Sequence, residues 1–81
     1  MTLEELYDKE KTRIEKLSHH YARIFGLDYE ELFDEGMLAV AETYARYALR
    51  TNDVELLRVS NKVVNRRMYK YARKEIDTRR D

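Results

Sequence analysis

The sequence predicts an all-α fold, a small bundle of three helices, and three observations lead to this prediction. Proline is absent and only two glycines occur in 81 residues, so the residues that usually interrupt helices are scarce. Apolar residues recur at intervals of three and four, as on one face of an α-helix, and no segment alternates with the period of two that is typical of strands. A chain of 81 residues forms one small domain, so we expect residues 1–81 to bury three apolar faces against one another.

The first helix is expected at about residues 3–25. Thr2 and Glu5 form a capping-box pattern, in which the two side chains satisfy the free backbone donors at a helix start. Gly26 is a natural stop, because glycine adopts the left-handed conformation of a helix end without steric cost. The apolar face of this helix comprises Leu3, Tyr7, Ile14, Leu17, Tyr21 and Ile24.

The second helix is expected at about residues 28–50, with Asp28 as its N-cap. Gly36 lies inside it at a cost of about 1 kcal/mol relative to alanine, which predicts that another backbone approaches closely there. The residues expected to face inward are Leu32, Phe33, Gly36, Met37, Val40, Ala41, Tyr44 and Tyr47 or Ala48.

The third helix is expected at about residues 54–76, after a loop at residues 51–53 in which Asn52 or Asp53 supplies the cap. Arg67 falls at the edge of its apolar face, so we expect it either to extend into solvent or to meet an acid from another helix. The residues expected to face the bundle are Leu57, Ser60, Val64, Met68 and Tyr71.

Composition argues against several classes of function. Without cysteine there is neither a disulfide framework nor a thiolate metal site. The longest apolar run, residues 37–41, is too short to cross a bilayer, and the first residues are acidic where a secretory signal is basic. We therefore expect a soluble cytoplasmic protein without a membrane partner.

No arrangement of residues predicts an enzyme, a cofactor or a metal site. His19 and His20 are adjacent, so on a helix they point about 100° apart and cannot hold one metal ion. The acids at the start of the second helix have a simpler role, because negative charge there complements the helix dipole. We expect recognition rather than catalysis.

Charge is distributed unevenly along the chain. Residues 1–47 carry eleven acids and six bases, a net charge of −5, and the remaining residues carry +5. No acid occurs from residue 56 to residue 74, so the usual intrahelical ion pairs are missing there. This stretch is either an ordinary solvated helix face or a surface for phosphates and unstacked bases. The candidate nucleic-acid contacts are Arg58, Asn61, Lys62, Asn65, Arg66, Tyr69, Lys70 and Arg73.

The segment Glu31-Leu32-Phe33-Asp34-Glu35-Gly36-Met37-Leu38-Ala39-Val40-Ala41 resembles region 2 of the bacterial sigma factors. That family has an acidic-Leu-apolar-Gln-Glu-Gly segment, followed by an amphipathic helix that ends in an aromatic residue, here Tyr44 or Tyr47. A second signature helix, rich in small, aromatic and basic residues, follows after a short loop, and residues 56–73 occupy its place. The resemblance covers roughly residues 20–74.

The resemblance implies a fold like that of sigma region 2 and two partners. In the family, the first signature helix docks on the clamp helices of the RNA polymerase β′ subunit, and the second reads and melts the promoter −10 element. The docking edge here would be Glu31, Asp34, Glu35 and Met37. An exposed acidic edge also suits a basic partner. The positions matching the promoter-reading helix are Asn61, Lys62, Val63, Arg66 and Tyr69.

Two departures from the family keep several functions open. Primary sigma factors place a tryptophan pair where Lys62 and Val63 stand and a tyrosine where Val59 stands. The helix-turn-helix domain that reads the −35 element is also missing. The chain is therefore interpreted as an excised domain, as half of a split sigma factor whose second subunit supplies that domain, or as a small phage-type regulator. The alternatives are a sigma mimic that binds polymerase and inhibits or redirects transcription without reading DNA, and a helical protein–protein interaction module without a DNA role.

Overall fold

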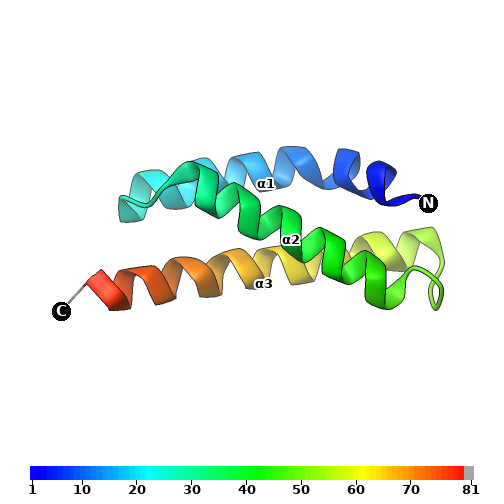
Figure 1. Ribbon diagram of the computed structural model, residues 1–81. Coiled ribbons are helices and arrows are strands. Elements are labelled where there is room, and N and C mark those ends of the chain that lie inside the picture. The colour runs from blue at the N-terminus through cyan, green and yellow to red at the C-terminus, as the bar shows by residue number, and fades with distance from the viewer. Residues whose placement is uncertain (80–81) are drawn as a thin grey trace.

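Three helices make up the computed structural model, which describes residues 1–79 (Figure 1). They are α1 (Leu3–Phe25), α2 (Tyr29–Tyr47) and α3 (Asp53–Arg79). No strand occurs among the described residues, so the prediction of an all-α three-helix bundle is confirmed. Helix α2 ends three residues before the expected position, because the amides of Arg50 and Thr51 both donate to the Tyr47 carbonyl and close a turn. Helix α3 extends three residues beyond the expected end.

Side chains cap the start of each helix. Thr2 Oγ1 accepts a hydrogen bond from the Glu5 amide at 3.1 Å, and Glu5 Oε1 accepts one from the Thr2 amide at 2.9 Å. The two bonds complete the capping box. Asp28 accepts from two amides at the start of α2, and Asn52 Oδ1 accepts from the Glu55 amide at 2.8 Å. At the end of α1, Gly26 adopts φ 66°, the left-handed conformation expected of it.

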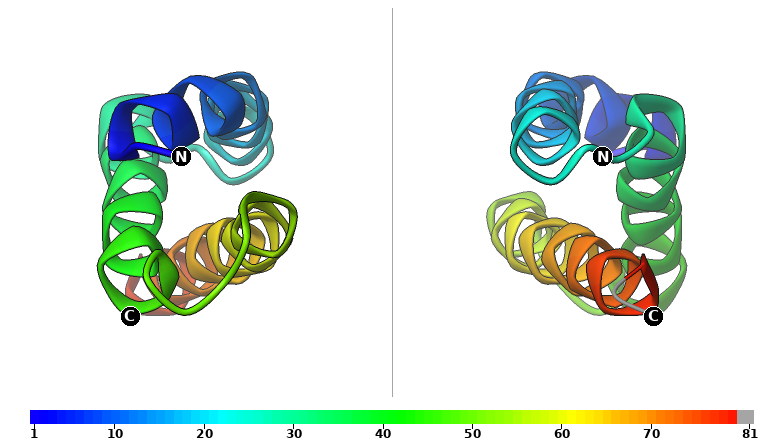
Figure 2. Two further views of the ribbon diagram at one scale, coloured as in Figure 1. Left: turned by 90° about the vertical axis from the view of Figure 1, so that its right-hand side faces the viewer. Right: turned by 90° about the vertical axis from the view of Figure 1, so that its left-hand side faces the viewer.

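Helix α2 packs against both other helices. It runs diagonally between α1 and α3 in Figure 1, and the end-on views show it to one side of both (Figure 2). The described chain measures 43 × 20 × 15 Å along its principal axes. None of its helices combines the length and the apolarity needed to cross a bilayer.

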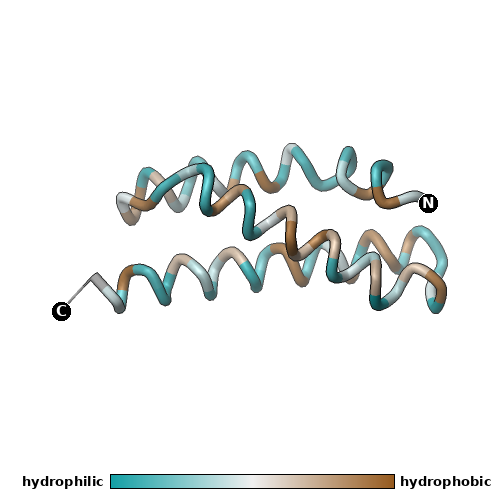
Figure 3. Tube along the Cα trace, in the orientation of Figure 1, coloured by the Kyte–Doolittle hydropathy of each residue, from teal (hydrophilic) through white to brown (hydrophobic). Residues whose placement is uncertain are grey.

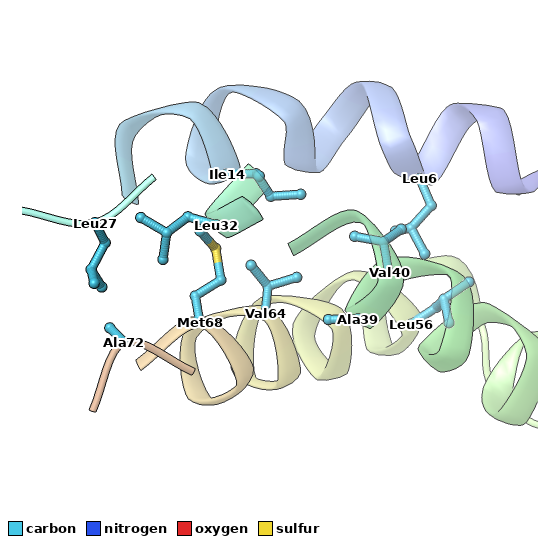
Figure 4. Packing of buried hydrophobic residues seen from close by; sticks show 10 residues of the cluster. All are labelled: Leu6, Ile14, Leu27, Leu32, Ala39, Val40, Leu56, Val64, Met68 and Ala72. Atoms are coloured by element: carbon cyan, nitrogen blue, oxygen red, sulfur yellow. The ribbon is translucent and has the colours of Figure 1, made fainter. Parts of the chain in front are cut away.

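The core is a single row of apolar side chains along the bundle axis. Ile14, Leu32, Val64 and Met68 meet at its centre, contributed by all three helices (Figure 4). Hydrophobic positions recur along each helix between hydrophilic ones, as the 3.6-residue repeat requires (Figure 3). The buried apolar residues are Leu6, Ile14, Leu27, Leu32, Ala39, Val40, Leu56, Val64, Met68 and Ala72.

The buried faces of α2 and α3 differ in detail from those expected. In α3, Leu56 and Ala72 are buried, whereas Leu57 and Tyr71 are only half-buried. In α2, Ala39 and Thr43 are buried but Ala41 is half-buried. The sequence pattern gives the apolar arc of a helix, but the centre of burial within that arc depends on where the neighbouring helices lie.

Gly36 lies on α2 where side chains of α1 and α3 both come close to it. A Cβ atom at this position would lie 2.7 Å from Ile14 Cγ2 of α1 and 3.0 Å from Met68 Sδ of α3. The expected close approach is therefore present, but it is made by side chains and not by another backbone. Glycine here allows two large core side chains to meet over α2.

A buried carboxylate joins α1 to α3. Glu10 is only 1% exposed, and its carboxylate accepts a hydrogen bond from Ser60 Oγ at 3.1 Å. Asn61, with its amide nitrogen facing α1, also donates to Glu10, and Arg13 lies 3.9 Å away. Burial raises the pKa of Glu10 above its ordinary value, although Ser60 and Arg13 oppose the shift. The sequence pattern predicts no role for Glu10.

Candidate protein and nucleic-acid interfaces

Helix α2 turns an acidic and apolar surface away from the bundle. Glu31 and Asp34, one helical turn apart, are both exposed. Leu38, one turn further along, is 50% exposed and places an apolar side chain beside the two acids. We name these three residues, Glu31, Asp34 and Leu38, the outer edge of α2.

Glu35 does not belong to this outer edge. Its side chain is 25% exposed, and Glu35 Oε2 lies 3.2 Å from Arg67 Nε of α3. The same guanidinium donates to Glu42 of α2, so one arginine joins two carboxylates across the helix pair. The prediction that Arg67 meets an acid from another helix is confirmed. Glu35 was expected in the docking edge, but the structure directs it toward α3.

The charges of this cluster stabilise one another. The hydrogen bond and charge of Arg67 hold the pKa of Glu42 below its ordinary value. The two carboxylates in turn raise the pKa of Arg67, chiefly through the hydrogen bond that Arg67 donates to Glu42. The ionised forms of Glu42 and Arg67 therefore favour each other.

Glu31 keeps its exposure but has a partner within the chain. The Tyr71 hydroxyl of α3 donates to Glu31 Oε2 at 2.8 Å. Partial burial, together with this hydrogen bond to a carboxylate, raises the pKa of Tyr71 to about 12. The hydrogen bond orients the Glu31 carboxylate, which stays exposed and can still meet a basic partner.

Met37 and Leu38 differ in exposure, and Met37 follows its expected inward placement more than its place in the docking edge. Met37, placed in the docking edge by the resemblance, is half-buried and packs against the core. Leu38 is the exposed apolar residue of this turn. Its position could have been found from the sequence, because Leu38 lies off the apolar arc that Leu32, Gly36 and Val40 define.

A cationic surface covers the solvent side of α3. No ion pair within residues 1–79 engages any of its basic side chains, and Tyr69 leaves 48% of its surface accessible beside them. The structure therefore brings most of the predicted nucleic-acid contacts onto one exposed face. These exposed residues are Arg58, Lys62, Asn65, Arg66, Tyr69, Lys70 and Arg73.

Asn61 is the exception among the predicted nucleic-acid contacts. It is half-buried on the side of α3 that faces α1, and its amide donates to the buried Glu10. An amide held by a buried carboxylate is not free to read a base. Helical position alone placed Asn61 beside the cationic residues, and the partner that occupies it comes from a residue 51 positions earlier in the chain.

Comparison with known protein families, with curated proteins and with solved structures gives no match for this chain. The functional assignment therefore depends on the residues themselves and on their placement.

Proposed function

We propose that this chain is a sigma-factor-like transcription protein that binds the RNA polymerase core. Its outer edge of α2 would dock on the clamp helices of the β′ subunit, as the resemblance implies. The observation that carries the proposal is the exposure of Glu31, Asp34 and Leu38 within the segment that resembles sigma region 2. Two carboxylates beside an exposed leucine provide charge attraction to a basic helix and an apolar contact at the same place.

The proposed role of Glu35 differs from that of its neighbours. Because Glu35 binds Arg67, it supports the outer edge by fixing α3 behind α2, and Asp34 carries more of the contact. Met37 likewise supports the edge from the core side, and Leu38 supplies the apolar contact. The proposed docking residues are thus Glu31, Asp34 and Leu38.

The exposed face of α3 supports a second part of the proposal, contact with promoter DNA. Its cations have no carboxylate partner within residues 1–79, so phosphates would meet them without breaking an ion pair. The family's base-stacking tryptophans are replaced by Lys62 and Val63, and only Tyr69 offers an exposed ring on this face. We therefore propose binding to an already open strand rather than melting of the duplex.

A second candidate is a sigma mimic that occupies the polymerase clamp without reading DNA. The same replacement of the tryptophan pair by Lys62 and Val63 favours it. Both candidates require the outer edge of α2 to bind polymerase, and they differ in whether the face of α3 binds DNA.

Binding to the isolated β′ clamp helices tests the shared part of both candidates, and absence of binding would leave only a helical interaction module. Binding to single-stranded oligonucleotides of −10 type then separates the two. If several α3 cations contact phosphates, the logarithm of the association constant should fall linearly with the logarithm of the salt concentration, with a slope of about −0.7 for each phosphate contacted. A flat salt response would remove the DNA contact and leave the mimic.

A further inference from the structure

A shallow groove runs between α2 and α3 on the side where Arg67 reaches Glu42. Two adjoining hollows form it, of about 360 Å³ over α3 and about 580 Å³ over the end of α2. The first hollow is lined by α3 alone, the second by residues 42–50 together with Val63, and Val63 in both linings marks where the two adjoin. Glu31, Asp34 and Leu38 are absent from this lining, so the groove is separate from the outer edge of α2.

Cations line both hollows of the groove. Lys62, Arg66 and Lys70 come from α3, and Arg46 and Arg50 come from the end of α2 and the turn after it. None of the five forms an ion pair within residues 1–79. Glu42 is the one carboxylate of the described lining, and Arg67 already neutralises it. The groove therefore fits an anionic occupant.

The spacing of these cations suits an occupant with repeated charges. Lys62, Arg66 and Lys70 follow one another by four residues, so each step advances about 6 Å along α3. Arg46 and Arg50 have the same separation in sequence and line the second hollow. A regular polyanion that runs from one hollow to the other would meet positive charge in both.

An aromatic ring indicates which polyanion fits. Tyr47 is half-buried at the end of α2 and lines the groove beside Arg46, Arg50 and the apolar Val63. A ring between arginines offers a stacking surface for an unpaired base, and stacking is how proteins bind single strands without a base code. An acidic peptide would use the cations but would gain little from the ring.

We infer that the groove between α2 and α3 binds single-stranded nucleic acid. In this inference Arg46 and Arg50 contact phosphates in the hollow next to the α3 cations, and Tyr47 stacks on a base. The inference rests on the nucleic-acid contact proposed for α3 and adds α2, to which the resemblance assigns polymerase docking alone. Because the groove lies over the end of α2 (residues 42–50) and the outer edge over residues 31–38, a strand and a protein partner would contact α2 at different places along its length and could bind together.

The test uses the whole chain and a fluorescent oligo-dT strand, with affinity measured over a range of salt concentrations. Arg46→Gln combined with Arg50→Gln should weaken binding at low salt and reduce the slope of log K against log salt by about 1.4, the value for two phosphates. The control is Lys9→Gln combined with Lys11→Gln on α1, which removes the same charge from exposed positions away from the groove and should leave the slope unchanged.

A second pair of measurements addresses the base and the identity of the ligand. Tyr47→Leu should weaken binding about tenfold, while Tyr47→Phe, which retains the ring, should keep the affinity. A glutamate-rich peptide of equal charge should compete poorly with the strand. Thermal unfolding of each variant verifies that the helices remain folded.

Three results would overturn the inference. The first is an Arg46/Arg50 variant that binds as tightly as the Lys9/Lys11 control, while the triple variant Lys62→Gln, Arg66→Gln and Lys70→Gln binds weakly. This result would exclude the α2 contact but would leave the proposed DNA contact of α3 intact. Another is unchanged binding by both sets of variants, which would remove the α3 contact as well. The third is equally tight binding of the glutamate-rich peptide, which would make the groove a protein-binding site.

Discussion

Arg67 Nε of α3 lies 3.2 Å from Glu35 Oε2 of α2, and this contact connects the fold to the proposed partner surface. The same arginine also binds Glu42, two turns further along α2. Arg67 therefore fixes the side of α2 that faces α3, and the neighbouring side presents Asp34 and Leu38 to solvent. A charge change at Glu35 disturbs both the helix pairing and the neighbouring surface.

Replacement of Arg67 by methionine should destabilise the protein. The change removes the guanidinium while keeping most of the apolar stem, and it leaves the half-buried Glu35 without its partner. We expect the free energy of unfolding to fall by about 1–2 kcal/mol, toward the lower value because both side chains are partly exposed. Urea unfolding measures the change. The adjacent and exposed Arg66→Met should shift stability by no more than about 0.5 kcal/mol, and an equal loss in both variants would contradict this role of Arg67.

Glu35→Lys should lower stability as well as any binding to a basic partner. The new lysine would stand against Arg67, so an attractive pair becomes a repulsive one. We expect a lower midpoint in thermal unfolding than for Glu35→Gln, with the difference shrinking at high salt as charges are screened. If Glu35→Lys unfolds at the wild-type temperature, the pairing with Arg67 does not hold α2 to α3.

Gly36→Ala should destabilise the protein, although alanine is the better helix former by about 1 kcal/mol. The added methyl would lie 2.7 Å from Ile14 Cγ2, so the core must shift to admit it. Overpacking of this kind typically costs about 1–3 kcal/mol, so after the gain in helix propensity we expect a net loss of up to about 2 kcal/mol in urea unfolding.

A double-mutant cycle tests the stated cause of that loss. Ile14→Ala removes the two carbon atoms that the new methyl would meet, so the double variant should lose less stability than the two single variants together. Additive losses would mean that Gly36 is required for another reason.

Ionisation of Glu10 should make the protein less stable as pH rises. Burial raises its pKa in the folded state, so the folded protein holds this proton to higher pH than the unfolded chain does. The contribution of Glu10 to the free energy of unfolding is therefore most favourable below its ordinary pKa of 4.5, and it is lost as pH rises through the pKa of the folded state. The glutamine in Glu10→Gln does not ionise. The stability of this variant relative to the wild type should therefore improve as pH is raised from 4.5 to 7.5, as measured by urea unfolding. A relative stability that stays constant over this range would contradict the effect of burial.

Much of the fold could be predicted from the sequence because it depends on local signals. The capping box at Thr2, the cap at Asp28 and the stop at Gly26 act within one helical turn, and all three occur in the structure. The position of Gly36 also indicated a close approach. That side chains rather than a backbone make this approach depends on the rotation of α1 and α3, which no local pattern encodes.

The candidate site was less predictable for the same reason. Asp34 and the cations of α3 lie on exposed arcs that a helical wheel identifies. By contrast, Glu35, Asn61 and Glu10 are engaged by partners 32 to 51 residues away in the chain. Side chains of the same type at neighbouring helical positions differ only in which helix they face, and that difference decides whether they are free to bind a partner.

We propose that the outer edge of α2 binds polymerase, and Asp34→Lys is the single substitution best suited to testing this binding. Asp34 has no ion-pair partner within residues 1–79, and a lysine there would follow Glu30 by four residues, a spacing that stabilises a helix by about 0.2–0.5 kcal/mol. The fold should therefore persist. The control is Asp8→Lys, which makes the same charge change at an exposed position of α1.

The measurement is the affinity for the isolated β′ clamp helices of the wild type and the two variants in parallel. We predict that Asp34→Lys weakens the complex at least tenfold, because it places like charges at the contact, and that Asp8→Lys binds like the wild type. Equal affinities for all three proteins, or no complex with the wild type, would contradict the account.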